Sequence, residues 1–430
     1  MGGETWSEWP FQEVIDFQEG PGILAKDFRE NGVPLIRLSG LDRVGSVING
    51  CNYLDPETVK KRWAHFALQQ GDILLSTSAS LGRIAVVGED AVGAIAYTGL
   101  IRMRPRDGRL YAQFIRYLLE GPEFQRQAEM VGVGSVIRHF GPMHLRKMSV
   151  RLPPPPEQRA IVHILGSLDD KIELNRQMNE TLQAMARALF KSWFVDFDPV
   201  RAKVERRDLG LPKPLADIFP SSFEDSELGE IPKGWKVLGL DEIARFLNGL
   251  ALQKYPPADG ETLPVIKIAQ LRAGNTKGAD RASMDVPPDY VVHDEDVLFS
   301  WSGSLECVLW AGGKGALNQH LFKVTSVNFP KWFFYLWIGE HLPSFRRIAA
   351  AKATTMGHIQ RHHLSEAKVV VPPSELLIAA DQHFRPLIDA IPKRLVQSRS
   401  LIVLRDELLP RLVSGDVRIE NAEKFLEQTA

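Results

Sequence analysis

Residues 153–197 read PPPPEQRAIVHILGSLDDKIELNRQMNETLQAMARALFKSWFVDF, a proline run followed by a long helical pattern. Prolines interrupt a strand and are tolerated in the first turn of a helix, so a helix is expected to begin here. Its seam advances in alternating steps of four and three residues, through Ile161, Leu165, Leu168, Ile172, Asn175, Asn179, Leu182, Ala186, Leu189 and Trp193. Sustained heptad spacing predicts a coiled-coil helix, which needs a second helix to cover its apolar stripe.

A second helix of the same kind lies near the end of the chain. It follows Pro372 and Pro373, and its seam runs through Phe384, Ile388, Ile391, Leu395, Ser398, Ile402, Arg405, Leu409 and Leu412. Because the two stripes are similar in length, we expect the helices to pair within the chain. Pro386 and Pro392 blemish the second seam, so two separate surface helices remain the alternative.

The segments in front of the two helices repeat each other, which is the signature of a duplicated module. The matched positions are Trp6, Glu13, Phe17 and Gly20 with Trp235, Glu242, Phe246 and Gly249, and Asp72, Ser76 and Ser80 with Asp296, Ser300 and Ser304. Further on, SVIRHFGPMHLRKMSVRLPP from Ser135 parallels TTMGHIQRHHLSEAKVVVPP from Thr354, matching His139 with His358 and His144 with His363. Short β-branched runs and amphipathic stretches indicate strands and helices in each module.

Two similar modules related by an approximate two-fold axis require their trailing helices to run antiparallel. Polar residues then meet near the middle of the seam, where they can set the register. The aligned centres predict Asn175 and Asn179 opposite Ser398, and an ion pair between Arg405 and Asp169 or Asp170.

The sequence therefore predicts an α+β fold. Two similar mixed α/β modules are joined by two long helices that form an antiparallel intramolecular coiled coil. We place the modules and connectors at residues 1–152 (module 1), 153–206 (first helix), 207–233 (a non-helical, proline-rich linker), 234–371 (module 2) and 372–430 (second helix).

The composition is that of a soluble globular protein. The chain has 430 residues, 44% of them hydrophobic, and a formal net charge of −1. No apolar run is long enough to span a bilayer and no signal peptide is recognisable, so we expect a cytoplasmic protein. Cys51 and Cys307 lack partners at metal-ligand spacing, which favours two reduced thiols.

Two segments are basic although the whole chain is not. Residues 96–151 contain ten Lys or Arg and four acidic residues, and residues 343–368 contain five basic residues and one acid. Either could be a solvated charged face, but their equivalent placement in the two modules favours contact with a polyanion.

Three stretches resemble the connecting helices and linkers of type I restriction–modification specificity subunits. They are PPPPEQRAIVHILGSLDDKIELNRQMNETLQAMARALFKSWFVDFDPVRAK, SELGEIPKGW and LRDELLPRLVSGDVRI. The resemblance spans essentially the whole chain. It implies that the modules are two target recognition domains, each of which reads half of a split, asymmetric site on double-stranded DNA.

The resemblance also implies the partners. The helices would dock two methyltransferase (M) subunits, which bind S-adenosylmethionine and methylate adenine, and motor-nuclease (R) subunits with ATP and magnesium would join for restriction. This chain would then carry no catalytic centre, cofactor or metal, and would work in a bacterial or archaeal cytoplasm. A helix pair of about 30 residues per strand spans roughly 45 Å and would set the unread spacer between the half-sites.

Side chains that read bases carry donors and acceptors on loops. For each serine, capping of a local turn is the competing interpretation. The candidate DNA-binding residues are Thr77, Ser78, Ser80, Arg83, Ser135, Arg138 and His139 in module 1, and Ser302, Ser304, Asn318, Gln319, His320, Lys352, Thr354, Thr355, His358, Gln360 and Arg361 in module 2. The aromatic run KWFFYLW from Lys331 to Trp337 predicts a buried helix rather than a base-stacking surface.

The first alternative is a self-contained DNA methyltransferase or nuclease. DVPPDY at Asp285 is a poor match to an adenine-binding motif, and VGVGS at Val131 is a weak glycine-rich turn. Asp296 with Glu366 and Lys368 could form a nuclease centre, but module 1 lacks the equivalent set.

A zinc site and a nucleotide-hydrolysing centre find equally little support. His358, His362 and His363 have only loose metal-ligand spacing, and no GKS or GKT phosphate-binding motif occurs. The remaining alternative is a coiled-coil scaffold protein, which explains the helices but not the duplicated modules.

Overall fold

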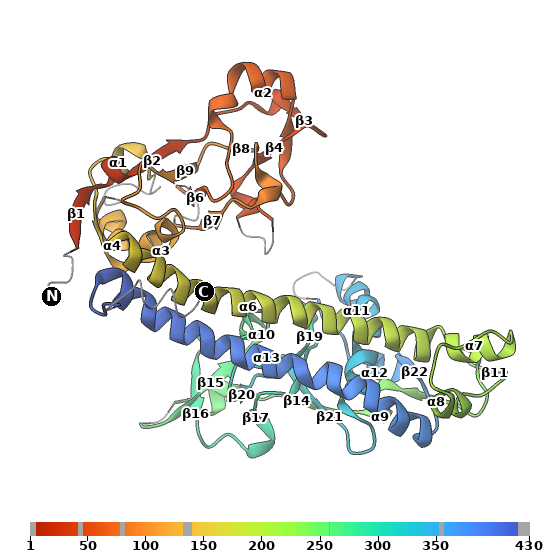
Figure 1. The fold of residues 1–430 in the computed structure, drawn as a ribbon. Helices are drawn as coiled ribbons and strands as arrows, with labels where there is room; N and C mark the ends of the chain where they lie inside the picture. Colours follow the sequence, from red (N-terminus) through yellow and green to blue (C-terminus); the bar gives the residue numbers. More distant parts are fainter. Residues whose placement is uncertain are drawn as a thin grey trace. The chain divides into compact units, whose positions relative to one another are not determined.

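The computed structural model describes residues 6–41, 46–77, 82–131, 140–257, 259–351 and 357–419. The chain forms two compact units (Figure 1). Unit 1 contains Met1–Asp170 and Ile402–Ala430, and unit 2 contains Lys171–Leu401. Each unit therefore holds one module together with part of both long helices.

Module 1 is built on two four-stranded sheets. The first has the strand order β2(Ile15–Glu19)-β9(Leu100–Pro105)-β6(Ile73–Ser76)-β7(Ile84–Val86), and all its pairs are antiparallel. The second has the order β3(Phe28–Arg29)-β5(Asn52–Leu54)-β4(Val33–Ile36)-β8(Ile95–Ala96), in which β4 and β8 are parallel. A ribbon of β1(Ser7–Pro10) and β10(Ser149–Leu152) brings the two ends of the module together.

Helices cover the first sheet of module 1. They are the single turns α1(Phe11–Val14) and α5(Pro142–Leu145), and the longer α3(Phe114–Glu120) and α4(Pro122–Val131), while α2(Pro56–Arg62) belongs with the second sheet. Phe11, Phe114 and Ile115 are completely buried and form the centre of this core.

Module 2 repeats the all-antiparallel sheet strand by strand and three strands of the second sheet, whose fourth strand pairs at the opposite edge. Its all-antiparallel sheet is β14(Arg245–Asn248)-β21(Leu321–Thr325)-β18(Val297–Ser300)-β19(Cys307–Leu309). The second sheet is β16(Arg281–Ser283)-β15(Thr262–Ile266)-β20(Gly315–Leu317)-β17(Val291–Val292), with β15 and β20 parallel. The ribbon β13(Lys236–Gly239)-β22(Lys368–Val371) again joins the module's ends.

Matched glycines explain part of the repeat. A Cβ on Gly20 would lie 2.0 Å from the Ala96 carbonyl oxygen, and one on Gly249 would lie 2.2 Å from the Asn318 carbonyl oxygen. Only glycine permits the backbone to pass so closely, which accounts for its recurrence at equivalent positions.

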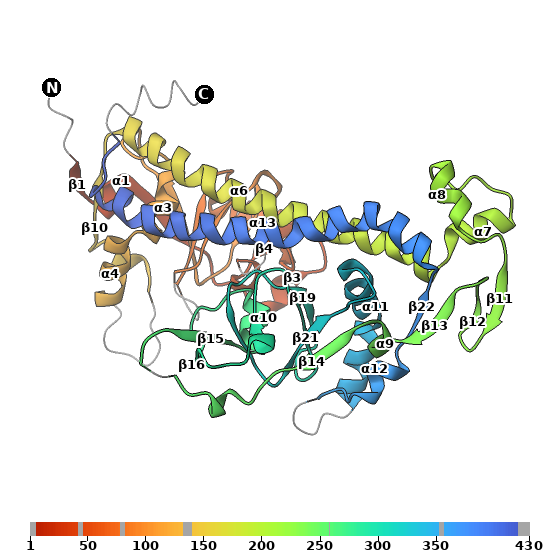
Figure 2. The same ribbon diagram turned by 90° about the horizontal axis from the view of Figure 1, so that it is seen from below.

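The two long helices are α6(Pro155–Phe190) and α13(Ser374–Ser414). They lie side by side and run in opposite directions (Figures 1 and 2). Within unit 2 the Asn175 side chain donates to the Ser398 hydroxyl, 3.2 Å away, and the Asn179 amide lies 3.4 Å from the Ile391 carbonyl oxygen. The predicted fold class and antiparallel pairing are confirmed, and Pro386 and Pro392 do not end α13.

The far end of the helix pair in unit 2 is rich in aromatic side chains. Phe384 stacks on Trp332 with ring centroids 4.4 Å apart, and Phe190 packs on both. Trp332 belongs to α11(Lys331–Ala351), whose aromatic run Trp332–Trp337 is buried throughout. The prediction of a buried helix at this run is confirmed.

The connector between α6 and module 2 differs from its prediction. It contains a π-helical turn (Lys191–Val195), α7(Asp198–Val204), α8(Lys213–Ile218) and the hairpin β11(Phe223–Ser226)-β12(Gly229–Pro232). The predicted non-helical linker was therefore wrong for residues 213–218, because Leu215 and Phe219 bury against the aromatic core and stabilise that helix. No helix among the described residues is long and apolar enough to cross a membrane.

Candidate nucleic-acid interface

Residues 301–305 of module 2 form a tight turn after β18, and the Ser300 side chain stabilises this turn. Ser300 is fully buried. Its Oγ accepts a hydrogen bond from Glu306 N (2.8 Å) and donates one to the Ser304 carbonyl oxygen (2.6 Å). Because the single hydroxyl joins both sides of the turn, the turn has a fixed shape.

Trp301 ties this turn to two other loops. Its indole Nε1 donates to Asn248 Oδ1 (2.9 Å) and to the Gln319 carbonyl oxygen (3.1 Å). Its backbone carbonyl accepts from Ile359 N (2.9 Å), and Gly303 N donates to the Gly357 carbonyl oxygen (2.8 Å). These hydrogen bonds bring three loops together, and we call residues 301–304, 318–320 and 357–361 the three-loop surface.

The structure brings together the described candidates of module 2. Ser304, Gln360 and Arg361 are exposed, and Gln319, His320 and His358 are partly exposed. The Arg361 guanidinium lies over the Phe322 ring, 6.0 Å from its centroid. These side chains can meet a ligand from solvent.

Two candidates in module 2 are buried instead. Ser302 is 3% exposed with its hydroxyl 3.1 Å from His320 Nδ1, and Asn318 is 5% exposed and accepts a hydrogen bond from His320 N. Their polar atoms contact His320, so in this structure both residues support the position of that side chain. Lys352, Thr354 and Thr355 lie outside the described residues.

Module 1 has the same scaffold with different side chains. Ser76, fully buried like Ser300, accepts a hydrogen bond from Arg83 N (2.9 Å). Thr77 occupies the position of Trp301: its N donates to Gly99 O (2.9 Å) and its carbonyl accepts from Phe140 N (3.3 Å). Thr77 is fully buried, whereas Arg83 is partly exposed. Ser78, Ser80, Ser135, Arg138 and His139 lie outside the described residues.

The supporting residues were not recognised in the sequence. Ser300, Trp301 and Asn248 carry the three-loop surface, yet only Ser300 was noted, as a match to Ser76. That match at the end of two equivalent strands was the available signal. A loop residue that reads a base and a buried loop residue that supports the loop look alike in sequence, because both are small and polar.

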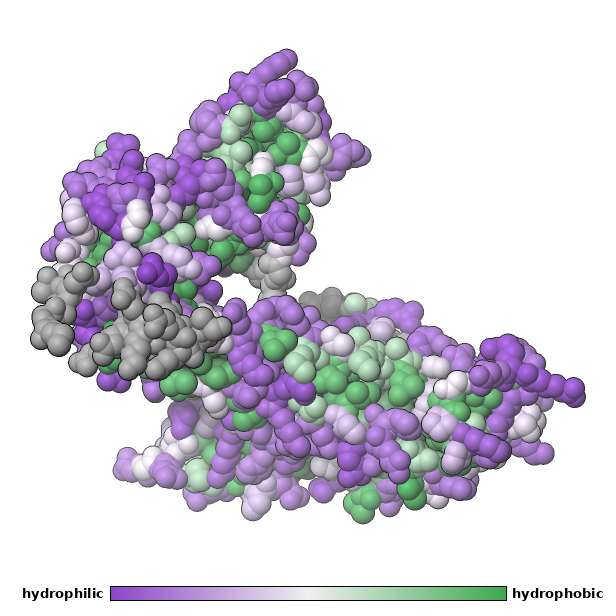
Figure 3. All heavy atoms as spheres, in the orientation of Figure 1, coloured by the Kyte–Doolittle hydropathy of each residue, from purple (hydrophilic) through white to green (hydrophobic). Residues whose placement is uncertain are grey.

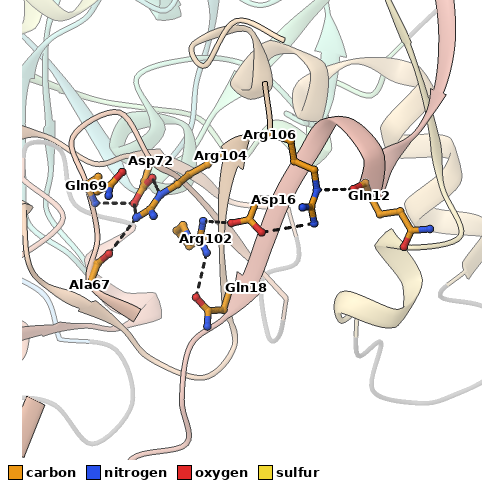
Figure 4. A network of polar contacts seen from close by, with 9 residues as sticks. All are labelled: Gln12, Asp16, Gln18, Ala67, Gln69, Asp72, Arg102, Arg104 and Arg106. Atoms are coloured by element: carbon orange, nitrogen blue, oxygen red, sulfur yellow. Dashed lines mark hydrogen bonds and ion pairs between the residues drawn. The ribbon is translucent and has the colours of Figure 1, made fainter. Parts of the chain in front are cut away.

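The matched aspartates of the two modules are structural. In module 1 the Asp72 carboxylate pairs with the Arg104 guanidinium and accepts from Gln69 N (2.7 Å; Figure 4). In module 2, Asp296 pairs with Lys323 (2.9 Å) and accepts from His293 N (2.8 Å). The Asp296 carboxylate is thus already engaged by a backbone N–H and by Lys323. The nuclease alternative would need this carboxylate as its first metal ligand, and it loses that ligand.

Several arginines in the basic segment of module 1 pair with acids elsewhere in the chain. Arg102 donates to Asp16 (2.6 Å) and to Gln18 (3.1 Å), and Arg106 lies 3.8 Å from the same Asp16 carboxylate (Figure 4). Arg116 likewise pairs with Asp169 at 3.0 Å. The interpretation of this segment as a polyanion-binding face was therefore wrong for these arginines, which join strands and helices within unit 1.

A cluster of His362, His363 and Glu366 brings possible metal ligands within 4.8 Å of one another. The Nδ1 atom of His363, however, accepts a hydrogen bond from Gln360 N (2.8 Å) at the start of α12(His362–Glu366). Its Nε2 then carries the proton and cannot bind a metal. His144, the matched residue in module 1, accepts from Gly141 N in the same way (3.0 Å), so both histidines are helix caps.

Comparisons with known proteins agree with this architecture. A family model described as "Type I restriction modification DNA specificity domain" matches residues 3–184 and 232–382. The MjaIX specificity subunit of Methanocaldococcus jannaschii is 25% identical over 97% of this chain and 95% of its own length. The HindI specificity subunit of Haemophilus influenzae is 23% identical over 82% of this chain and 87% of its own.

A solved structure shares the fold. The S subunit of a type I restriction–modification system from M. genitalium superposes with a TM-score of 0.56 at 14% identity, covering 95% of this chain and 96% of that one. At this identity the likeness concerns the arrangement of modules and helices.

Proposed function

Because the chain belongs to the type I restriction–modification DNA specificity family, and is a specificity subunit of such a system, we propose that its two modules each read one half of a split DNA site. The two modules share a scaffold but differ in the side chains that it carries. The site is therefore asymmetric in sequence.

The observation that carries this proposal is the three-loop surface of module 2. It presents Gln319, His320, His358, Gln360 and Arg361 on a rigid base. Amide, imidazole and guanidinium groups supply the paired donors and acceptors that distinguish base edges in the major groove. In module 1, Arg83 stands at the end of the equivalent turn. The undescribed candidates of both modules stay part of the proposal.

We assign the docking of two methyltransferase subunits to the long helices. On α6, the apolar side chains of Leu174, Met178 and Met185 are 46%, 36% and 52% exposed and follow one face at helical spacing. Leu395 of α13 is 38% exposed although it lies in the seam. Figure 3 shows hydrophobic side chains gathered over this part of unit 2. Exposed apolar stripes of this kind suit a protein partner.

The chemistry belongs to the partners in this proposal. The methyltransferase subunits bring S-adenosylmethionine, the motor-nuclease subunits bring ATP and magnesium, and this chain brings sequence choice without a cofactor of its own. The assembly acts on DNA in the cytoplasm of a bacterium or archaeon. A scaffold protein would need no rigid polar surface on either module.

Exchange of residues 1–152 for the corresponding module of a relative tests the proposal. The chain is co-expressed with its methyltransferase, and adenine methylation is mapped across the host DNA. One half of the methylated site is expected to change while the other half and the spacer persist. Exchange of residues 234–371 is the reciprocal control. A change of both halves in either exchange, or failure of the chain to co-purify with the methyltransferase, would contradict the proposal.

A further inference from the structure

We infer that Trp301 and Ser300 are positioning residues that hold the base-reading loops of module 2 in one arrangement. This inference rests on the proposed function, because it concerns how strictly one half-site is read. Neither residue has to touch DNA for this role. Ser300 is fully buried, and the Trp301 indole is directed at Asn248 and Gln319 inside the module.

The hydrogen bonds of the indole make Trp301 the common member of the three loops. Its one N–H is shared between the Asn248 side chain, at the end of β14, and the Gln319 main chain. Its ring lies against His320 and His358, with centroid separations of 5.7 and 6.3 Å. The Ser302 hydroxyl and the Trp301 backbone N–H also contact His320. Loss of the indole N–H would therefore loosen the 318–320 loop, with two side chains of the three-loop surface, without detaching it from the 301–305 turn.

Ser300 fixes the other side of the same turn. Its hydroxyl uses both its donor and its acceptor capacity on Ser304 and Glu306. Alanine at this position would leave the Glu306 N–H without its side-chain acceptor and would free the exposed Ser304 to move. The serine and the indole therefore constrain one loop from two directions.

Discrimination between bases depends on this constraint. A side chain that can move by an ångström adapts to a second base and loses selectivity, whereas a pre-organised one penalises the mismatch. Module 1 shares the serine, as Ser76, but has Thr77 in place of the tryptophan. A change at Trp301 should consequently affect only the half-site that module 2 reads.

The test uses the full chain with its methyltransferase and compares Trp301→Phe, Ser300→Ala and Ser326→Ala. Ser326 is the matched control, because it makes the same two kinds of bond, to Ile243 O (2.7 Å) and from Phe329 N (3.1 Å), beyond the opposite end of β21. For Trp301→Phe and Ser300→Ala, mapping of methylated adenines should show base preference in the module 2 half-site reduced roughly tenfold. Ser326→Ala should leave preference in both halves unchanged.

Every result of the methylation mapping either supports or overturns the positioning role of Trp301 and Ser300. Relaxation confined to the half-site that changes when residues 234–371 are exchanged supports the positioning role, and Ser76→Ala should relax the opposite half. An unchanged map for Trp301→Phe, or equal loss of preference in both halves, overturns it. If Trp301→Phe yields too little protein, Asn248→Ala takes its place, because it removes one acceptor of the indole N–H and leaves the ring in place. The same relaxation of the module 2 half-site is then expected. Absence of any bipartite methylated site with the unaltered chain refutes the proposed function instead.

Discussion

Asp169 illustrates how single side chains join a module to both long helices. Its mostly buried carboxylate accepts hydrogen bonds from Tyr117 Oη and Arg405 Nη1 and forms an ion pair with Arg116, each at 3.0 Å. The ion pair with Arg405 confirms the contact predicted from the antiparallel alignment. Burial, and then the negative charge of Asp169, raise the pKa of Tyr117, so the phenol stays a donor at any physiological pH.

Asp169→Ala should destabilise unit 1 by about 3 kcal/mol, because it leaves two partly buried guanidinium groups without their shared acceptor. Denaturant unfolding followed by tryptophan fluorescence measures the change. Glu173→Ala on the same helix removes a pair with Arg176 in which Glu173 is 43% exposed, and should cost less than about 1 kcal/mol. Equal losses of stability for the two substitutions would refute the role of Asp169 as the shared acceptor of two partly buried guanidinium groups.

Asp294 fastens a loop of module 2 to α13. Partial burial alone would raise its pKa, but hydrogen bonds from Arg399 (2.8 and 3.0 Å) and from Gly313 N (2.7 Å) hold the pKa below its ordinary value of 3.8. A depressed carboxyl pKa stabilises the folded state above the unfolded value. This contribution disappears as the pH falls through the folded pKa.

The Asp294→Asn variant should therefore melt below the unaltered chain at pH 6. The difference between their melting temperatures should shrink as the pH is lowered beneath 3.8. Differential scanning calorimetry at several pH values measures it. Asp289→Asn removes a long, exposed contact with Arg245 and should change little. A difference in melting temperature that does not change with pH would rule out the ionised Asp294 carboxylate as its cause.

At the scale of elements, the helix pair is specified by a polar layer inside an apolar seam. Asn175 is 1% exposed and donates to Gln397 Oε1 (2.9 Å) and Ser398 Oγ (3.2 Å). Asn179, one step further along the seam, is also buried. Buried amides cost stability but penalise every register in which they meet apolar side chains.

Asn175→Leu should raise the free energy of unfolding by about 1 kcal/mol while weakening the preference for a single register. Thermal melting together with sedimentation velocity tests both expectations, since loss of register should appear as self-association. Gln177→Leu adds the same apolar side chain on the exposed side of α6 and controls for surface hydrophobicity. A destabilised, strictly monomeric Asn175→Leu chain would show that the layer serves stability instead.

The persistence of α13 through two prolines also belongs to this scale. Pro386 and Pro392 each remove a helical hydrogen bond, which predicted a possible kink. Ile388 and Ile391 are each 1% exposed between them, and Phe384 is completely buried. Tertiary burial on both sides of the prolines offsets the lost bonds, and no local rule contains that information.

For the whole molecule, α6 and α13 pass without interruption from one unit into the other. Insertion of one heptad after Asp170 together with one after Leu401 adds about 10 Å to each helix. In the proposed function this should lengthen the unread spacer by roughly three base pairs at 3.4 Å each. Methylation mapping would show it, and an unchanged spacer would remove the helices as its determinant. The insertion in α6 alone should abolish methylation, because the Asn175–Ser398 and Asp169–Arg405 contacts can then no longer form in one register.

The sequence by itself determined the duplication, the two long helices, their antiparallel pairing and the family. These features rest on patterns that repeat along the chain: heptads in the seams, matched motifs in the modules and prolines before each helix. Periodic patterns reflect which face of an element is buried, so they can be read without knowing the partner.

Only the tertiary structure decided which polar side chains are available to a ligand. Arg102, Arg104 and Arg116 contributed to a basic segment in the sequence, yet each pairs with a carboxylate distant in the chain. Thr77, Ser302 and Asn318 looked like loop residues that could read bases, and they are buried. Exposure and pairing depend on long-range contacts, whereas residue type and spacing record only local chemistry.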